Sequence, residues 1–174
     1  GISVPELSTQ LFSFNNPQGA CPECSGLGVR QFFDPALVVP DRSLSIAAGA
    51  IATWGMRSLT SYGGQMLQAL AGHYRFDLEK PFASLPARVQ EIILHGSGKE
   101  LIEFHYRKGR RNLVSHAVFE GVIPQLDRRF HETASPMIRE ELGRYINEQP
   151  CPVCDGARLK PEALAVRIGP WSII

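Results

Sequence analysis

The chain has 174 residues, of which 44% are hydrophobic and 20% are charged, and its formal net charge is +1. A chain of this length and apolar content is expected to form one domain, or a small domain with an appendage, rather than a disordered segment. The balanced charge excludes a general attraction to polyanions, so any nucleic-acid surface must be a local patch. No apolar run approaches the roughly 20 residues of a membrane span, and residues 1–20 carry no export signal. We therefore expect a cytoplasmic protein without a membrane partner.

The N-terminal region leads into the first of two cysteine pairs. An apolar patch at residues 11–14 and a turn-rich segment precede Cys21-Pro22-Glu23-Cys24-Ser25-Gly26, and the pattern Cys-Pro-x-Cys-x-Gly returns at residues 151–156. Two residues between the thiols let a tight turn aim both sulfurs at one ion, and two such turns complete the four-thiolate shell that zinc favours. The sequence predicts one zinc ion per chain, bound by Cys21, Cys24, Cys151 and Cys154.

Three alternatives to zinc are less favoured. Two local disulfides would be strained across such short loops and would need an oxidising compartment. A redox-active pair requires a thioredoxin-like setting around one pair only, and haem attachment requires a histidine where Ser25 and Asp155 stand. The pairs are also much further apart than the roughly 15–20 residues of ordinary zinc ribbons. We interpret the segment between them as a domain inserted into a zinc module, whose ion would hold the entry and exit of that domain together.

The segment between the cysteine pairs is expected to consist of helices around a β-hairpin. Apolar residues at helical spacing predict helices over residues 62–73, over 85–95 with Ser84 as cap and Gly96 as stop, and over 121–130. A further helix is expected to begin at Ser135 and to continue to Pro150, directly before the second cysteine pair. Residues 101–106 and 113–118 predict a hairpin that turns at Gly109.

After the second cysteine pair, residues 162–168 alternate in the manner of a strand, and an apolar ending follows. We expect an α+β fold, with a mostly helical insertion domain that carries a β-hairpin and projects from a four-cysteine zinc module. The expected divisions are residues 1–44, 45–145 and 146–174. The apolar ending indicates a fragment of a larger protein.

Motifs for catalysis are mostly missing. The run Gly96-Ser97-Gly98-Lys99-Glu100 resembles a phosphate loop, but Ile93 stands where that motif needs glycine and Glu100 stands where it needs the magnesium-binding hydroxyl. We interpret its glycines as a helix stop and a turn. His105 and His116 are interpreted as a cross-strand pair in the hairpin, with a second metal site as the alternative.

The hairpin tip is the candidate nucleic-acid surface. Arg107, Lys108, Arg110 and Arg111 follow one another there without an intervening acid. Such a cluster either contacts phosphates or is a solvated loop tip. Arg128 and Arg129 could extend the surface, although neighbouring acidic residues dilute its charge.

Three segments, residues 11–28, 96–100 and 150–159, resemble the UvrA family, the ATP-driven damage-recognition subunits of bacterial nucleotide excision repair. The resemblance covers essentially the whole chain. It implies that residues 45–145 are the insertion domain of the first signature domain of a larger ABC-type ATPase, attached to the zinc module. It also implies duplex DNA as a partner, and UvrB and a second copy as partners of the parent protein through its other parts. The contribution implied for this segment is DNA binding and clamping during damage recognition.

The same resemblance limits the activity that we expect. The chain lacks the Walker and signature motifs of the family's ATPase, so we expect no enzymatic activity from it and assign ATP and magnesium to the parent protein alone. Two other functions remain open. One is a structural or protein-docking flap without DNA contact. The other is a peptide-binding module like that of Hsp40 chaperones, which is disfavoured because Arg158 replaces a glycine of that repeat.

Overall fold

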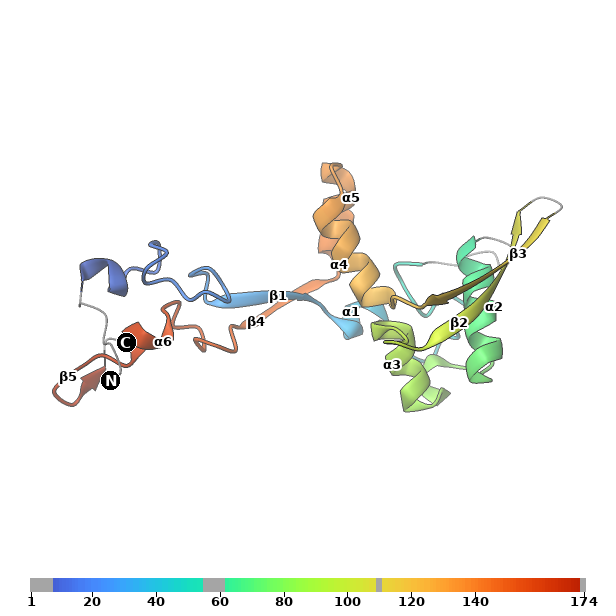
Figure 1. Ribbon diagram of the computed structural model, residues 1–174. Coiled ribbons are helices and arrows are strands. Elements are labelled where there is room, and N and C mark those ends of the chain that lie inside the picture. The colour runs from blue at the N-terminus through green and yellow to red at the C-terminus, as the bar shows by residue number, and fades with distance from the viewer. Residues whose placement is uncertain (1–7, 55–61, 109–110, 173–174) are drawn as a thin grey trace. The chain divides into compact units, whose positions relative to one another are not determined.

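The structure is a computed structural model that describes residues 8–54, 62–108 and 111–172 (Figure 1). The chain divides into two compact units. Residues 1–32 and 147–174 form one unit, here called the cysteine unit, and residues 33–146 form the other, here called the central unit. Among the described residues, none of the helices is both long enough and apolar enough to cross a membrane.

The cysteine unit is built from short elements. They are the 3-10 helix η1 (Thr9–Phe12), helix α6 (Pro161–Leu164), and the strands β5 (Arg167–Ile168) and β6 (Trp171–Ser172), which pair with each other. Strands β1 (Val29–Phe33) and β4 (Ile146–Pro150), which border on this unit, pair in a two-stranded sheet. A small apolar cluster of Leu11, Leu159 and Ala163 packs η1 against α6. With so little apolar core, this unit depends on the four buried cysteines that lie beside the cluster.

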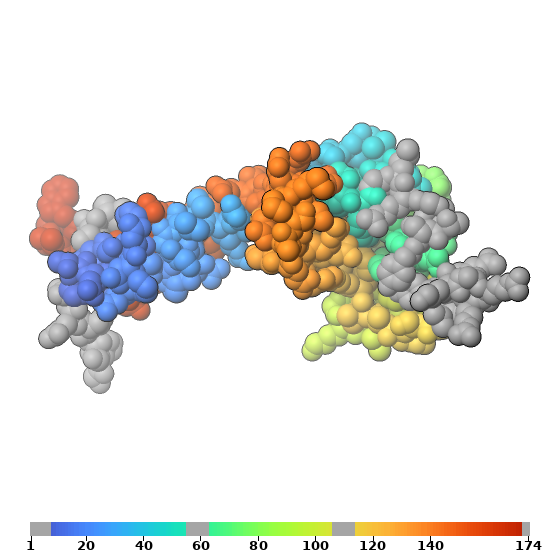
Figure 2. Space-filling model, turned by 90° about the horizontal axis from the view of Figure 1, so that it is seen from above, coloured from blue at the N-terminus to red at the C-terminus, as the bar shows by residue number. Residues whose placement is uncertain are grey.

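The central unit has helices on a single hairpin. Its helices are α1 (Pro35–Val38), α2 (Tyr62–Tyr74), η2 (Phe82–Ser84), α3 (Ala87–His95), α4 (Val122–Glu132) and α5 (Pro136–Gly143), and its strands are β2 (Leu101–Lys108) and β3 (Arg111–Val118). Helix α2 packs on β2, α3 packs on α4, and α4 packs on α5 (Figure 1). The space-filling view shows α5, in orange, at the surface of this unit (Figure 2). The fully buried side chains of the core include Val38, Leu70, Phe82, Ile93, Ile102, Val122 and Leu126.

The expected mixture of helices and one hairpin is confirmed, and so are the helices expected over residues 62–73, 85–95 and 121–130. One cap is wrong. Helix α3 begins at Ala87 after Pro86, whereas the Ser84 hydroxyl donates to the Pro81 carbonyl instead of capping the helix. Gly96 ends α3 as expected, with φ of 98°.

Two stretches adopt a different structure from the expected one. Helix α5 ends at Gly143, and residues 146–150 form strand β4 instead of continuing the helix to Pro150. Strand β4 pairs along one edge with β1, and the Gln31 amide donates to the Glu148 carboxylate across the pair at 2.9 Å. The strand expected over residues 162–168 is mostly wrong, because α6 begins at Pro161, whose fixed φ suits the first turn of a helix.

The hairpin is confirmed, and its register decides which residues share a face. Ile102 lies opposite Ala117 and Phe104 lies opposite Ser115, and Ile102 and Phe104 are buried in the core. Leu101, by contrast, is 60% exposed, as expected for the opposite face of a strand. One face of the hairpin therefore packs on the central unit, while the other faces solvent.

Two glycines allow the end of α3 to cross the start of α4 at backbone distance. Both have positive φ, 98° at Gly96 and 90° at Gly121. A Cβ on Gly121 would lie 2.5 Å from the backbone nitrogen of Gly96, and a Cβ on Gly96 would lie 2.5 Å from the carbonyl oxygen of Glu120. Since no side chain fits between these backbones, only glycine permits this crossing.

We predict that Gly121→Ala destabilises the chain by at least about 2 kcal/mol, because it adds both left-handed strain and a backbone clash. Gly72→Ala is the matched control. A Cβ there meets nothing within 4 Å, so replacing this glycine of α2 should stabilise by about 0.5–1 kcal/mol. Urea unfolding followed by the fluorescence of Trp54, which packs against the core, measures both values. Equal changes in the free energy of unfolding for the two substitutions would contradict the close approach of the two backbones.

Candidate zinc centre and nucleic-acid surface

The four cysteine sulfurs converge on one point within the cysteine unit. All four lie within 4.8 Å of one another, with 3.9 Å between Cys21 and Cys151 and 3.8 Å between Cys24 and Cys154. A tetrahedral ion with zinc–sulfur bonds of about 2.3 Å separates its ligands by about 3.8 Å. A disulfide would place the sulfurs about 2.05 Å apart, and all four cysteines are free thiols. The donor set and its spacing therefore fit one zinc ion and not two disulfides.

The two cysteine pairs share one backbone conformation. Ser25 and Asp155, which follow the second cysteine of each pair, have φ of 49° and 48°. Gly26 and Gly156 come next, with φ of 79° and 83°. These two consecutive positions match in the sign and size of φ, so each cysteine pair forms the same tight turn, here called a knuckle.

Each knuckle donates a backbone N–H to one of its own sulfurs. The N–H of Gly28 donates to Cys24 Sγ at 3.2 Å, and the N–H of Arg158 donates to Cys154 Sγ at 3.3 Å. Such hydrogen bonds stabilise a thiolate and orient it toward a metal. The equivalence of the two bonds shows that Arg158 stands in the second knuckle where Gly28 stands in the first.

The knuckles also bind each other through reciprocal backbone hydrogen bonds. The N–H of Cys21 donates to the carbonyl of Arg158, and the N–H of Cys151 donates to the carbonyl of Gly28, both at 2.9 Å. The site thus joins two segments that are 130 residues apart in the chain. These bonds hold the two knuckles side by side, with their sulfurs converging on one point.

Burial, hydrogen bonds and neighbouring thiols shift the pKa values of Cys24 and Cys154 in opposite directions. Burial alone would raise the pKa of Cys24, but the N–H of Gly28 and the neighbouring thiols outweigh it and lower the pKa to about 7. Burial raises the pKa of Cys154 to about 11, and the neighbouring thiols add to this effect although the N–H of Arg158 opposes it. Of these two thiols, Cys24 therefore ionises more readily, and a bound cation would favour the thiolate form of both.

The glycine-rich run at residues 96–100 is structural. The N–H of Ser97 donates to the Phe119 carbonyl, and the N–H of Phe119 donates back to the Ser97 hydroxyl, both at 2.8 Å. Ser97 therefore fastens the end of α3 to the end of β3. The interpretation of this run as a helix stop and turn is consistent with these bonds, which leave the Ser97 hydroxyl engaged with protein.

Glu100 ties three elements together, and sequence reasoning missed this role. Its carboxylate accepts from the Tyr74 hydroxyl at 3.0 Å, contacts His73 Nε2 at 2.9 Å, and lies 3.6 Å from the Arg88 guanidinium. The hydrogen bonds with His73 and Tyr74 lower the pKa of Glu100. Burial and the bond to Glu100 raise the pKa of Tyr74 to about 12. His73 and Tyr74 are far from Glu100 in sequence, so only the packing of α2 on β2 reveals the contact.

The two hairpin histidines do not face each other as expected. Register places His116 opposite Glu103 and His105 opposite Val114. Both imidazoles instead contact the Glu103 carboxylate, from His105 Nε2 at 2.7 Å and from His116 Nε2 at 3.2 Å. Within the described part of the chain, the four cysteines form the only group of metal-ligating side chains whose donor atoms converge within 4.8 Å. The structure therefore does not support a second metal site at these histidines.

The expected DNA-contacting cations fall into two groups. Arg110 lies outside the described residues, as do the side chains of Arg107, Lys108 and Arg111, although these three belong to β2 and β3. The other group consists of Arg128 and Arg129 on α4, which the structure does describe.

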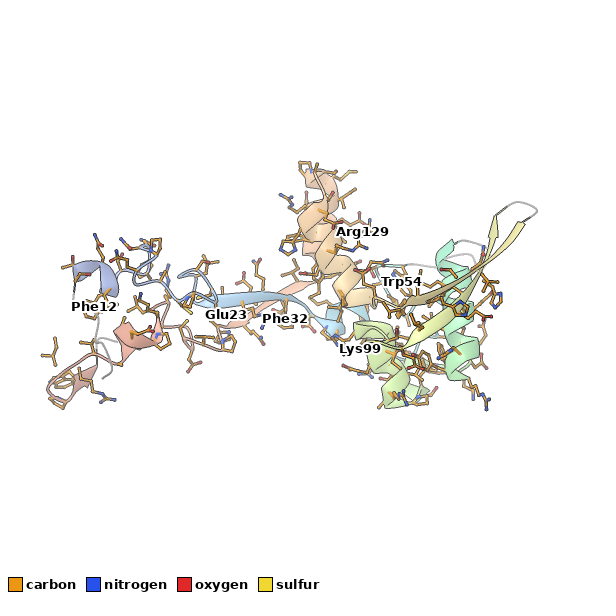
Figure 3. All side chains as sticks on the ribbon, viewed as in Figure 1. Phe12, Glu23, Phe32, Trp54, Lys99 and Arg129 are labelled. Atoms are coloured by element: carbon orange, nitrogen blue, oxygen red, sulfur yellow. The ribbon has the colours of Figure 1, made fainter. Side chains whose placement is uncertain are left out.

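Arg128 and Arg129 differ in the contacts that they make. The Arg128 guanidinium donates to both carboxylate oxygens of Glu120, at 2.8 and 3.0 Å, and to Glu132 at 3.1 Å. These bonds lower the pKa of Glu120 and raise that of Arg128. Arg129 is exposed on the same helix (Figure 3), and no carboxylate among the described side chains pairs with it. Of the two guanidinium groups, only that of Arg128 is paired with carboxylates among the described side chains.

We predict one zinc ion per chain and its loss in Cys21→Ser. A three-thiolate site with a serine binds zinc weakly, so the cysteine unit should loosen while the core of the central unit keeps its helices. Elemental analysis of the purified chain and far-ultraviolet circular dichroism measure the two effects. Absence of zinc from the unsubstituted chain, or nitrogen in the first shell by X-ray absorption, would contradict the prediction.

We predict that the chain loses stability in acid as the Glu100 carboxylate becomes protonated. The pKa of this carboxyl is lower in the folded chain than its usual value of 4.5. Its contribution to the free energy of unfolding is therefore fully present above pH 4.5 and is lost as the pH falls toward the pKa of the folded chain. Glu100→Gln should flatten the dependence of unfolding free energy on pH in this window. The control is Glu79→Gln, at an exposed carboxylate outside the described salt bridges. A slope unchanged by Glu100→Gln would argue against the contact with His73 and Tyr74.

Comparisons with known proteins agree with this architecture. The model of the UvrA DNA-binding domain matches residues 34–144. UvrABC system protein A of Pasteurella multocida (strain Pm70) is 52% identical over 170 residues, and its counterpart in Escherichia coli (strain K12) is 49% identical over 169 residues. Each alignment covers 97% of this chain and 18% of the relative, so the chain spans about a fifth of the length of these relatives.

A solved structure matches the fold as well. The crystal structure of UvrA2 from Deinococcus radiodurans superposes with a TM-score of 0.71 and 28% identity, over 94% of this chain and 21% of that protein. The match therefore includes both the cysteine unit and the central unit. Since the family model covers most of the chain and two relatives are about half identical over nearly all of it, the chain belongs to the UvrA family.

Proposed function

We propose that this chain is a zinc-containing, DNA-contacting segment of a UvrA-type protein, which helps to hold duplex DNA during damage recognition in nucleotide excision repair. The observation that carries the proposal is the match of the UvrA DNA-binding domain model to residues 34–144, which nearly coincide with the central unit. The converging cysteines support the zinc part of the proposal, because their spacing suits that ion.

In this proposal the zinc ion has a structural role. Four protein ligands leave no open position for a substrate or an activated water, which distinguishes structural from catalytic zinc sites. Cys21, Cys24, Cys151 and Cys154 would hold the ion, and when bound it supplies the positive charge that lets four buried thiolates coexist. The insertion domain of residues 45–145 is then held at both ends by one metal centre.

Contact with DNA is assigned to cations at the hairpin tip and on α4. Arg107, Lys108, Arg110 and Arg111 lie in a stretch free of acidic residues, so phosphates would meet no opposing charge there. Arg129 would add a contact from α4, whereas Arg128 would orient Glu120 and Glu132 rather than bind DNA. All of these are phosphate contacts, which position a protein on DNA without reading its sequence.

Other activities of the family belong to the parent protein in this proposal. ATP and magnesium would bind to parts of the parent beyond this chain, and so would UvrB and the second copy of a homodimer. The chain itself would contribute affinity and placement on the duplex, with no catalytic step of its own.

A docking flap without DNA contact is the second candidate, and one observation favours it. The solvent face of the hairpin carries three exposed apolar side chains, Leu101 at 60%, Val114 at 55% and Val118 at 48%. Apolar side chains on an exposed strand face are more typical of a protein interface than of a DNA surface. Removing the neighbouring cations distinguishes the two functions.

We predict that replacing Arg107, Lys108, Arg110 and Arg111 with glutamine weakens DNA binding equally for all sequences. Each lost phosphate contact should reduce the slope of log affinity against log salt by about 0.9. Arg129→Gln should reduce the same slope by about 0.9, the value expected for one lost contact. Titration of fluorescently labelled duplexes over a range of salt concentrations measures these slopes.

The control is Lys80→Gln with Lys99→Gln, which removes two exposed cations elsewhere in the central unit. Lys99 is labelled in Figure 3. This double substitution should leave the salt slope nearly unchanged. If the four-residue variant retains both its affinity and its slope, the tip is a solvated loop and the docking function takes the place of DNA contact.

A further inference from the structure

Arg158 occupies a backbone position that normally needs glycine. It is the counterpart of Gly28, and both lie in the left-handed region, with φ of 69° at Arg158 and 83° at Gly28. A residue with a Cβ is strained there, and glycine would serve the backbone better. Since the first knuckle does use glycine, the arginine must be explained by what its side chain does.

The Arg158 side chain reaches across to the other knuckle. Its Nε donates to the carbonyl oxygen of Gly26 at 2.7 Å, a bond that spans 132 residues of sequence. Gly28 makes room for this path, because a Cβ on Gly28 would lie 2.8 Å from Arg158 Cγ. Glycine in one knuckle and arginine in the other are therefore complementary.

An aromatic ring holds the guanidinium in place. Its central carbon lies 3.6 Å from the centre of the Phe14 ring, within the range of a strong cation–π contact. The backbone of Phe14 also packs tightly on the first knuckle, since a Cβ on Gly26 would lie 2.0 Å from the Phe14 carbonyl oxygen. Arg158 thus joins the second knuckle to the first through one hydrogen bond and one stacked ring.

The charge of Arg158 suits the proposed metal centre. A zinc ion with four thiolates has a net charge of −2, and hydrogen bonds and cations around such a site stabilise it. Arg158 contributes both, because its backbone N–H binds Cys154 Sγ while its guanidinium binds the loop that follows Cys24. A neutral residue at this position would provide only the backbone bond.

We propose that Arg158 is a positioning residue that clasps the two knuckles together and slows the release of zinc. The inference rests on the zinc part of the proposed function. Zinc can leave only when a sulfur swings away from the ion, and separating the knuckles gives it room to do so. Because Arg158 holds the knuckles together, it lowers the rate of zinc release.

The Arg158→Gly variant separates this role from that of the backbone. Glycine relieves the left-handed strain and is the residue found at this position in the first knuckle. If Arg158 acted through its backbone alone, zinc release from the glycine variant would be equally fast or slower. The clasp predicts the opposite, with release about tenfold faster, the lower end of the usual effect of losing a partner around a metal site. The two explanations therefore differ in sign.

Three further variants complete the test. Asp155→Gly relieves the same kind of strain at φ of 48° without removing the clasp, and should release zinc at nearly the original rate. Arg158→Lys keeps the charge but loses the Nε–H bond, so it should release zinc at an intermediate rate. Phe14→Leu removes the ring alone, and it should also accelerate release.

The measurement is the rate of zinc transfer from the purified chain to a chromogenic chelator in excess, after the zinc content of each variant has been determined. Faster release in Arg158→Gly and Phe14→Leu, with Asp155→Gly unchanged, supports the clasp. Unchanged or slower release in Arg158→Gly overturns it while leaving the zinc site in place. A chain that contains no zinc before any substitution contradicts the proposed function itself and, with it, the clasp.

Discussion

The convergence of four thiols from two distant segments is the constraint on which the cysteine unit depends. Few apolar side chains are buried there, and β1 and β4 make only a two-stranded sheet. Such a pair of strands is marginally stable in water by itself. The reciprocal backbone bonds of the knuckles and the sulfur cluster supply the missing connections, and a bound cation would remove the repulsion among the thiolates. Metal binding and folding are expected to be coupled in a site of this kind.

The central unit has a different source of stability. Its core is a continuous apolar cluster to which the helices and the hairpin all contribute, and Gly96 and Gly121 let two of its backbones cross closely. Polar contacts then fix the elements relative to one another, with Glu100 linking α2 and α3 to the start of β2. A unit with its own core can retain its structure when the cysteine unit is perturbed, which is why effects on zinc and effects on helix content should separate.

Local patterns in the sequence predicted the parts that depend on local physics. The Cys-Pro-x-Cys-x-Gly repeat identified all four converging thiols, and the apolar spacing located α2, α3 and α4. Prediction failed where distant residues decide the outcome. Ile146 continues the apolar spacing of α5, yet pairing with β1 makes residues 146–150 a strand. The Arg158 contact with Phe14 and the Glu100 contact with His73 leave no local signal, because each joins segments that meet only after folding.

The central claim is that a metal held by four cysteines stabilises the cysteine unit, whereas the central unit is stabilised by its own apolar core. Amide hydrogen exchange of the whole chain, recorded by NMR with zinc bound and after its removal by a chelator, tests this claim most directly. We predict that the amides of Cys21, Cys151 and the residues of β1 and β4 lose protection when zinc is removed, whereas those of Ile93 and Ile102 in the central core stay protected. Unchanged protection at the cysteines, or equal loss of protection throughout the chain, would contradict the account.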